Sequence, residues 1–506
     1  GSEMCIRDRL VPQMEPLVSL LNALVGVDIT ESDVVRSLEP AERSDRLIDL
    51  LVRLVDAFAD QESLVLTVEG LHFADRSTIR FLEQGSRTWR TGRLLAVVTY
   101  RDDLAPEFSP ARSRTVDLAL QPLDRAGSDA LVRQLLGQQQ VAEALLAGVY
   151  ERARGNALVT SELVRSVGSS ELLDDPGRLE PRDVEELLGA LDVPDRLQRL
   201  VMARVDRLAP GARWVLTRAA VVGSSFALPA VEALRISETR RVSGPTGLQQ
   251  LIEGGLIDPA AAASLDAFGF RHEVIRDVAY GSLLFRDRRG LHGDLARHLE
   301  DAHATDLDRV AATIAGHYRG AGIHESAGSY AVRAGDWALG SYAVEDAESS
   351  FSAALEDFRQ AAGGLSWERS LVSERIGDCC SLGGRPLDAL GRYKQALGSW
   401  KRADLARRPL IDADRADGRL VGEREAELCR KIAREQQWAD RYERALDWID
   451  RAERASGGGR RARTVASSSL RCGTLFRLGR YRAAAAEGER ALRLALADDC
   501  LLYTSP

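Results

Sequence analysis

Apolar positions near the start of the chain follow a helical spacing, which then gives way to a strand-like run. Between residues 11 and 60 apolar side chains recur three or four positions apart, as in Leu47, Leu50, Leu51, Leu54, Val55 and Phe58. After Ser63 the chain continues as Leu-Val-Leu-Thr-Val and ends on Glu69. The first pattern predicts an amphipathic helix, and a short apolar run bounded by polar residues predicts a buried strand. We therefore expect a helix that leads into a strand closed by a carboxylate.

A second strand is expected after one further helix. Asp75 is predicted to cap a helix over 76–90, because a short acidic side chain can accept hydrogen bonds from the free amides of the first turn. An apolar run over 94–99 follows and leads to Arg101. Two buried strands joined by a helix predict a right-handed β-α-β unit. Glu69 and Arg101 are thus expected at the same edge of a parallel sheet, where such folds bind ligands.

The middle of the chain changes from short strands to helices. A third short strand is expected over 116–120, and helices are expected from there to residue 167, with a turn at Gly155-Asn156. A polar stretch with proline and glycine, residues 169–182, is predicted to be a linker. Beyond residue 193, helices and two strand-length apolar pieces over 256–270 are typical of a winged helix.

The helical region after residue 306 carries a weak repeat. Three small residues and one large residue return at spacings of 12, 4 and 3. The sets are Gly335, Ala347, Phe351 and Ala354; Gly377, Ala389, Tyr393 and Ala396; Ala433, Ala445, Ile449 and Ala452; and, less well, Cys472, Ala484, Gly488 and Ala491. Small residues let two antiparallel helices approach closely while the large residue fills the gap, as in a tetratricopeptide (TPR) hairpin. The sets start at irregular intervals, so a generic helical bundle is the alternative.

Composition adds limits on size and compartment. With 506 residues the chain should divide into roughly three or four domains. The net charge is −8 and lysine occurs only three times, so arginine makes up most of the basic residues, which does not by itself indicate nucleic-acid binding. Six cysteines without a C-x-x-C pair argue against a disulfide or zinc scaffold. Apolar stretches stay far below the ~18 residues that span a bilayer, so we expect no membrane contact and a cytoplasmic protein.

Both terminal segments break the surrounding pattern. Residues 1–9 read GSEMCIRDR and residues 500–506 read CLLYTSP, which resemble translated adapter sequence at the ends of assembled reads. We expect both segments to be non-native and the protein to continue past both, and we exclude them from the fold.

Glu69 has the chemistry of a magnesium ligand. Mg²⁺ prefers oxygen ligands, and P-loop nucleotide-binding folds hold it beside the phosphates with a carboxylate at the end of a strand. The phosphate-binding motif G-x-x-x-x-G-K-S/T is absent from the chain, and no lysine precedes Lys394. Either the phosphate-binding loop belongs to a preceding part of the protein, which is our interpretation, or the site is inactive.

Six motifs in a fixed order carry a resemblance to one family. They are V-E-G-L-H-F-A-D (68–75), V-T-Y-R-D (98–102), G-N-A-L-V (155–159), F-R-H-E-V-I-R-D-V-A-Y (270–280), R-R-G-L-H (288–292) and A-R-H-L-E (296–300). This order resembles the signal-transduction ATPases with numerous domains, the AAA-like STAND class, in the bacterial branch of LuxR-type regulators and ATPase-coupled cyclases. The resemblance covers about residues 10 to 490. It implies a cytoplasmic bacterial switch that uses ATP, ADP and Mg²⁺.

The chain departs from the family pattern at two positions. Gly70 stands where the family has a second acid, which orients the attacking water, so slow or absent hydrolysis is expected. Ala157 replaces the proline of the family's G-N-P motif, which lies on the adenine side. We therefore name no catalytic residue.

Three residues are candidates for nucleotide binding, each with a structural alternative. Glu69 could hold Mg²⁺ through water, or close the sheet edge by pairing with an arginine. Arg101 could sense the γ-phosphate, or pair with Asp102 or Asp103. The resemblance places His272 against the β-phosphate of ADP, while the alternative is a satisfied histidine at a helix start.

A basic cluster near residue 290 is the one candidate for direct DNA contact. Acidic residues interrupt it and no aromatic residue interleaves with it, so a solvated helix is favoured over a DNA-contacting wing. The cluster consists of Arg286, Arg288, Arg289, His292, Arg297 and His298. DNA would be contacted only through a separate C-terminal domain outside this chain.

The expected fold combines an α/β core with helical domains. An incomplete P-loop NTPase core lacking Walker A but carrying Walker B is expected over 10–120, a helical lid over 121–190, a winged-helix domain over 191–305, and an all-α TPR-like superhelix over 306–499.

The expected function is that of a fragment of an ATP-dependent signalling switch or transcription regulator. ATP or ADP with Mg²⁺ would bind the intact protein and not this chain alone, which we expect to be inactive as an ATPase. A protein or small-molecule inducer would bind the repeats. Self-association of the intact protein is a further candidate interaction. The alternatives are a TPR adaptor that binds no nucleotide, and the regulatory half of an adenylate or guanylate cyclase.

Overall fold

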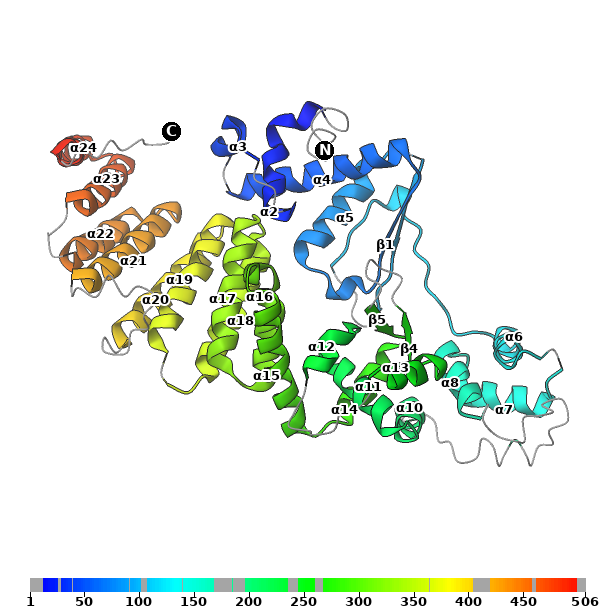
Figure 1. Cartoon of the computed structure of the whole chain (residues 1–506). Helices are drawn as coiled ribbons and strands as arrows, with labels where there is room; N and C mark the ends of the chain where they lie inside the picture. The colour runs from blue at the N-terminus through cyan, green and yellow to red at the C-terminus, as the bar shows by residue number, and fades with distance from the viewer. Residues whose placement is uncertain are drawn as a thin grey trace. The chain divides into compact units, whose positions relative to one another are not determined.

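The computed structural model describes residues 12–25, 29–38, 40–90, 92–101, 107–138, 140–167, 184, 196–234, 244–259, 267–363, 365–403, 419–456 and 461–497. The expected non-native ends and the expected linker over 169–182 lie outside this set. Helices dominate the described residues, and the strands are few and short (Figure 1). The chain forms two compact units. The first unit is Gly1–Val116, Thr305–Arg319 and Ile323–Pro506, and the second unit is Asp117–Ala304 and Gly320–Gly322.

The first unit begins with the helix and strands that the apolar pattern predicts. Helix α4 (Pro40–Gln61) leads into β1 (Leu64–Val68), helix α5 (Arg76–Thr88) follows, and β2 (Leu94–Val98) comes next. The two strands pair in parallel, from Leu64 opposite Leu94 to Val68 opposite Val98. Asp75 caps α5 by accepting a hydrogen bond from the Thr78 amide at 2.7 Å, as predicted. Shorter elements here are η2 (Pro12–Leu21), α2 (Asn22–Val25), α3 (Asp33–Ser37), η3 (Leu71–Phe73) and η5 (Arg112–Arg114).

Only one face of the two-stranded sheet is well covered. Leu66, Val68, Leu94 and Val98 pack against a buried cluster on α4, η3 and α5. The cluster consists of Ile48, Val52, Leu71, Ile79, Leu82 and Trp89. On the opposite face Val65 and Leu95, which pair in register, are 63% and 58% exposed. This face therefore presents apolar side chains to solvent.

The strand expected over 116–120 is not formed, and this prediction was wrong. Val116, Leu118 and Leu120 alternate as a strand would, yet all three side chains are exposed. An extended segment counts as a strand only when a neighbouring strand accepts and donates its backbone hydrogen bonds. No described strand pairs with these residues.

The second unit opens with three helices around a small apolar core. They are α6 (Arg125–Leu136), α7 (Glu143–Ala153) and α8 (Ala157–Val167). Gly155 supplies the turn before α8 with a left-handed φ of 78°, and a Cβ there would lie 2.2 Å from the Leu123 carbonyl oxygen. Only glycine fits this close approach, so the Gly155-Asn156 turn has a steric cause.

The rest of the second unit combines helices with a three-stranded antiparallel sheet in the order β3-β5-β4. Phe226 from β3 packs near Phe268 and Phe270 of β5, over the buried core of α11 and α14. The strands are β3 (Ser225–Ala227), β4 (Ile257–Pro259) and β5 (Ala267–Phe270). The helices are α10 (Arg196–Asp206), α11 (Pro210–Val222), α12 (Leu228–Ala233), α13 (Gly244–Glu253), α14 (Glu273–Gly281) and α15 (Phe285–Ala302). The winged-helix assignment stays a prediction.

The first unit continues as a series of helical hairpins, consistent with the expected TPR-like superhelix (Figure 1). The helices are α16 (Leu307–Ala321), α17 (His324–Gly340), α18 (Val344–Gln360), α19 (Ser366–Leu382), α20 (Pro386–Arg402), α21 (Arg419–Trp438), α22 (Tyr442–Ala455), α23 (Arg461–Arg477) and α24 (Tyr481–Ala497). A Cβ on Gly335 would lie 2.5 Å from the Phe351 ring, and one on Gly377 would lie 2.6 Å from the Tyr393 ring. The small-against-large packing read from the repeat is therefore present.

Candidate functional site

The carboxyl ends of β1 and β2 form the edge where the sequence predicts nucleotide chemistry. The Thr99 amide donates to the Val68 carbonyl oxygen at 2.9 Å, and the Leu71 amide donates to the Thr99 carbonyl oxygen at 2.8 Å. The Gly70 amide donates to Thr99 Oγ1 at 3.2 Å. These bonds extend the parallel pairing past the strands and fix the loop that carries Glu69.

Glu69 and Arg101 both lie at this edge, as predicted. Glu69 directly follows β1, is exposed, and makes no hydrogen bond or ion pair with another described residue. Arg101 lies three positions after the end of β2 and is also exposed. Asp102 and Asp103, the alternative partners of Arg101, lie outside the described residues.

Gly70 explains why this edge carries one acid and not two. Its backbone is left-handed, with φ of 69° and ψ of 47°. A side chain there would also meet the Phe73 ring at 3.3 Å. Residues with a Cβ rarely adopt this conformation. A second carboxylate at position 70 would therefore require a different loop.

The residues at this edge fit only part of a magnesium–nucleotide site. Glu69 offers an oxygen ligand of the kind Mg²⁺ prefers when phosphates and water complete its shell. The amides of Gly70 and Leu71 are already bonded to Thr99, so neither is available for a phosphate. Among the described residues no group of three or more His, Cys, Asp and Glu side chains is placed to hold a metal ion.

His272 lies in the second unit, immediately before α14, and its side chain does not cap that helix. Burial lowers its pKa, the Glu162 carboxylate opposes this shift, and the positive charges of Arg165 and Arg271 add to it. Arg271 Nε donates to Asp258 Oδ2 at 2.9 Å. His272 is thus held neutral over a wider pH range, beside a cluster of charged residues.

The centre of that cluster is Glu162, which sequence reasoning missed. Its side chain is 1% exposed and accepts from Arg165 Nη1 at 3.3 Å and from Arg204 on α10. Arg204 also donates to the Gly254 carbonyl oxygen. The available signal was an acid directly before the apolar Leu163 and Val164 of α8. A buried carboxylate of this kind has to be paired.

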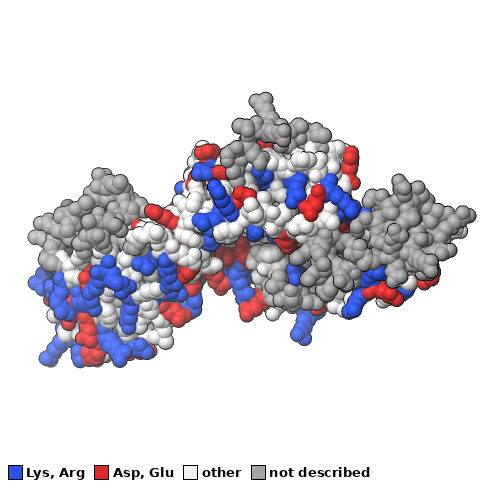
Figure 2. All heavy atoms as spheres, turned by 90° about the horizontal axis from the view of Figure 1, so that it is seen from below, with Lys and Arg blue, Asp and Glu red and all other residues white. Residues whose placement is uncertain are grey.

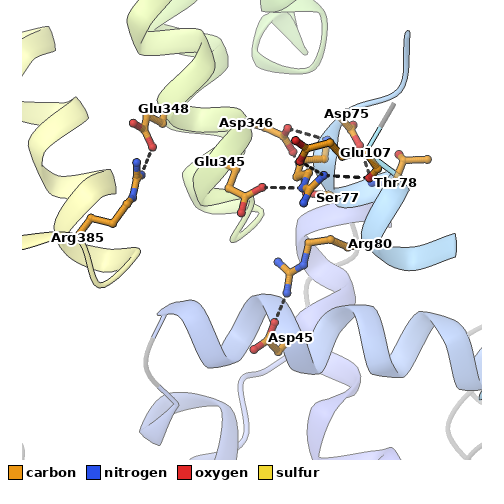
Figure 3. Close-up of polar contacts among 11 residues, drawn as sticks. Asp45, Asp75, Ser77, Thr78, Arg80, Glu107, Glu345, Asp346, Glu348 and Arg385 are labelled. Atoms are coloured by element: carbon orange, nitrogen blue, oxygen red, sulfur yellow. Dashed lines mark hydrogen bonds and ion pairs between the residues drawn. The ribbon is translucent and has the colours of Figure 1, made fainter. Parts of the chain in front are cut away.

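A contact between α5 and α18 lies within the first unit, close to the sheet edge (Figure 3). Asp346, in the first turn of α18, accepts from Ser77 Oγ at 2.8 Å through Oδ2 and from the Arg76 amide at 3.4 Å through Oδ1. Arg76 Nε also lies 3.5 Å from Glu345 Oε2. The first turn of α5 is thus capped twice, by Asp75 from its own chain segment and by a residue of the first repeat hairpin. We call this the α5–α18 contact.

Tyr342 extends the α5–α18 contact to the helices before β1. It occupies the turn between α17 and α18 with a left-handed φ of 60°, and it packs against the apolar cluster of η2, α3 and α4. Arg43 Nη1 donates to Tyr342 Oη at 3.1 Å. The sequence held no signal for this contact, because its partners are about 270 residues or more apart.

Burial raises the pKa of Asp346, against the hydrogen bond from Ser77, which lowers it. The nearby Asp75 and Glu345 carboxylates raise it further, while the bond from the Arg76 amide lowers it. The raised pKa indicates that the α5–α18 contact loses more solvation around this carboxylate than its hydrogen bonds return.

Comparison with known proteins yields similarities but no family. No family model matches the chain. An uncharacterized protein of Rhizobium meliloti (strain 1021) is 25% identical over 311 residues, which cover 60% of this chain and 29% of that protein. The match thus spans under a third of the length of that relative.

Two solved structures are similar at low TM-scores. The STAND protein with a tetratricopeptide repeat sensor, PH0952 from Pyrococcus horikoshii, has 10% identity and a TM-score of 0.37, with 89% of this chain and 71% of that chain covered. BtubC from P. vanneervenii has 13% identity and a TM-score of 0.31, with 44% and 96% covered. Neither value identifies the family or the function. Within the described residues no helix is long and apolar enough to cross a membrane.

Proposed function

We propose that this chain is the central part of an ATP-dependent signalling switch of the STAND class, acting in the cytoplasm as a transcription or signalling regulator. The observation that carries the proposal is the position of Glu69 and Arg101, which both follow the carboxyl ends of two parallel paired strands. Ligands of open parallel sheets bind at that edge. A carboxylate for Mg²⁺ and a guanidinium for a phosphate are the groups that nucleotide binding requires there.

Each candidate residue has one role in this switch. Glu69 holds Mg²⁺ through water, Arg101 contacts the γ-phosphate, and neutral His272 donates its ring N–H to the β-phosphate of ADP. With Gly70 in the left-handed conformation there is no second acid to orient water. Hydrolysis is therefore slow, and the bound nucleotide marks the state of the switch.

The phosphate-binding loop would come from a preceding part of a longer protein. The exposed apolar face around Val65 and Leu95 supports a larger sheet core than the one described. The sequence of this chain has no G-x-x-x-x-G-K-S/T motif and no lysine before Lys394, so the lysine and amide cradle of that motif are missing from it. It should accordingly bind ATP and ADP very weakly.

The repeats would receive the signal and pass it to the nucleotide site. A ligand shifts a switch only by its difference in affinity for the two states. An inducer on the repeats therefore has to bind one arrangement of the first unit better than the other. The α5–α18 contact supports such coupling, because it joins a repeat hairpin to the helix that follows Glu69. DNA would be bound by a further domain.

The test is calorimetry with Mg–ATP on two proteins. The chain itself should give no measurable heat of binding at micromolar protein, and micromolar affinity would contradict the proposal. The protein encoded by the complete reading frame should carry a G-x-x-x-x-G-K-S/T loop ahead of β1 and bind Mg–ATP. In that protein Glu69→Gln should weaken the Mg²⁺-dependent part of binding, whereas Glu356→Gln, on the exposed side of α18, should not.

A second candidate is a repeat adaptor that binds no nucleotide. The observation that favours it is the bonding of the Gly70 and Leu71 amides to Thr99, which leaves the edge without a phosphate cradle of its own. A complete reading frame with no glycine-rich loop would select this candidate.

A further inference from the structure

Ion pairs join successive helices of the first unit, α16 to α17, α17 to α19 and α19 to α21. Asp308 pairs with Arg333 at 2.7 Å, Asp336 with Arg375 at 3.4 Å, and Asp378 with Lys431 at 2.5 Å. Asp336 and Asp378 directly follow the first small residue of their sets, whereas Asp308 lies ahead of the first set. Each base lies two positions before the first small residue of its own set. We call this series of pairs the ion-pair ladder.

The ion-pair ladder stops at α21. The residue after the first small residue is Asp336, Asp378, Arg434 and Gly473 in the successive sets. The residue two before it is Arg333, Arg375, Lys431 and Leu470. Arg434 thus replaces the acid, and Leu470 replaces the base that would pair with it. Arg434 is exposed and makes no ion pair with another described residue.

Exposed aromatic side chains lie near the point where the ion-pair ladder stops. Trp438 lies one turn after Arg434 on α21 and is 71% exposed. On the next hairpin Phe476 is 62% exposed and Tyr481 is 63% exposed, with their rings edge to face at 5.5 Å. Arg477 beside Phe476 is exposed and, like Arg434, has no ion pair with a described residue.

A hydrogen bond holds α21 against α23 at this level. Gln437, which precedes Trp438, donates through Nε2 to the Leu470 carbonyl oxygen at 3.1 Å and also bonds to Thr474. The Thr474 and Phe476 side chains are two positions apart on α23. Trp438 directly follows Gln437 and Phe476 lies two positions after Thr474, so both residues lie close to this bond in the chain. We call Arg434, Trp438, Phe476, Arg477 and Tyr481 the Trp438 surface.

We propose that the Trp438 surface binds a protein segment that combines acidic and apolar side chains. Aromatic and arginine side chains are the residues that contribute most to protein interfaces. Two cations without ion-pair partners favour a segment with one or two carboxylates, because burying them against neutral groups would cost solvation. The inference names the partner of the sensor repeats in the proposed switch and rests on that function.

A nucleic acid fits the Trp438 surface less well. Figure 2 shows acidic and basic side chains mixed over the parts of the face that are drawn in colour. Acids also lie on the same hairpins, where Asp450 and Glu453 bind Arg471 and Glu443 binds Arg480. A long phosphate backbone needs a continuous positive track. A short acidic segment needs only the two arginines.

The test is fluorescence anisotropy with the full chain and a labelled 12-residue peptide of alternating Glu and Leu/Phe residues. Saturable binding is expected, and it should weaken as the salt concentration rises. Trp438→Ala and Arg434→Glu should each weaken binding by about tenfold or more. A peptide with every Glu replaced by Lys should not bind.

The matched controls are Trp337→Ala and Arg309→Glu. Trp337 is an exposed tryptophan on α17, and Arg309 is an exposed arginine on α16, both distant in sequence from the Trp438 surface. Circular dichroism should give the same helix content for all four variants. Loss of binding in the controls to the same extent as in the test variants would overturn the proposal.

Three other results would also overturn it. The first is absence of saturable peptide binding by a folded chain. The second is tighter binding of a 12-nucleotide single strand that displaces the peptide. The third is a dimer in sedimentation that Trp438→Ala dissociates and the peptide leaves intact, which would assign the surface to a second copy. No readout here involves nucleotide, so failure leaves the Mg–ATP experiment untouched, and failure there leaves peptide binding interpretable.

Discussion

The Ser77 hydroxyl donates a hydrogen bond to the Asp346 carboxylate at 2.8 Å, across 269 residues of sequence. It joins the first turn of α5 to the first turn of α18 (Figure 3). Only the short η3 segment separates α5 from the loop that carries Glu69. A change at the sheet edge therefore has a short route to the repeats. Coupling of this kind has to be measured, because proximity alone does not establish it.

A double-mutant cycle measures the strength of this hydrogen bond. Ser77→Ala and Asp346→Ala should each lower the protection of the Arg76 amide against hydrogen exchange, because that amide also donates to Asp346. We expect each single change to cost about 1 kcal/mol of local stability and the double change to cost clearly less than the sum. Glu356→Ala, on the same helix and exposed, is the control and should leave the amide unchanged.

The α5–α18 contact should also depend on pH. Burial raises the pKa of Asp346 above the ordinary value of 3.8, so the contact favours the protonated carboxyl. Its contribution is then fully present below that value and is lost as the pH rises through the raised pKa. The difference in Arg76 protection between wild type and Asp346→Ala should therefore be larger at about pH 4 than at pH 7. An opposite trend would mean that the hydrogen bonds outweigh burial.

The packing of the first repeat hairpin predicts two opposite effects of the same substitution. Gly335→Ala places a methyl group against the Phe351 ring and should lower the stability of the repeats by about 1–3 kcal/mol. Gly340→Ala, at the end of the same helix, meets open space and should be neutral or stabilise by about 0.5 kcal/mol. Thermal unfolding followed by circular dichroism compares the two. Equal effects would contradict the close approach of α17 and α18.

Removal of the Arg204 side chain should destabilise the second unit strongly. Glu162 is almost fully buried and would lose its pairing with Arg204, so Arg204→Ala should cost about 2–4 kcal/mol. The double variant Glu162→Gln with Arg204→Met removes both charges and should recover most of this loss. Calorimetric melting of wild type, Arg204→Ala and the double variant checks the order. If the double variant is less stable than Arg204→Ala, the ion pair stabilises the second unit by more than the neutralisation of one charge by the other.

Local sequence patterns predicted the helices, strands and hairpin contacts that depend on residues close together in the sequence. The change of apolar period at Ser63 places α4 and β1, and the Asp75 cap places the start of α5. The repeat predicts the pairing of Gly335 with Phe351 and of Gly377 with Tyr393, because steric fit between neighbouring helices depends on residues a fixed distance apart.

The remaining features depend on partners that are distant in the sequence. The expected strand at 116–120 has the right alternation but no described strand beside it, so its pattern alone was not enough. Asp346 is one of several acids in the first turn of a helix, and nothing in the sequence distinguishes it as the partner of Ser77. Glu162 shows the same limit: its position on α8 is visible in the sequence, but the arginine that binds it lies 42 residues further on.

The proposed switch depends on Glu69 being part of a magnesium–nucleotide site that a preceding phosphate-binding loop completes. The most direct measurement is Mg–ATP binding by the protein of the complete reading frame, compared with its Glu69→Gln variant. We expect a glycine-rich loop ahead of β1 and an affinity that depends on Mg²⁺ and falls by about tenfold or more in the variant. A reading frame without that loop, or an affinity that Glu69→Gln leaves unchanged, would contradict the claim.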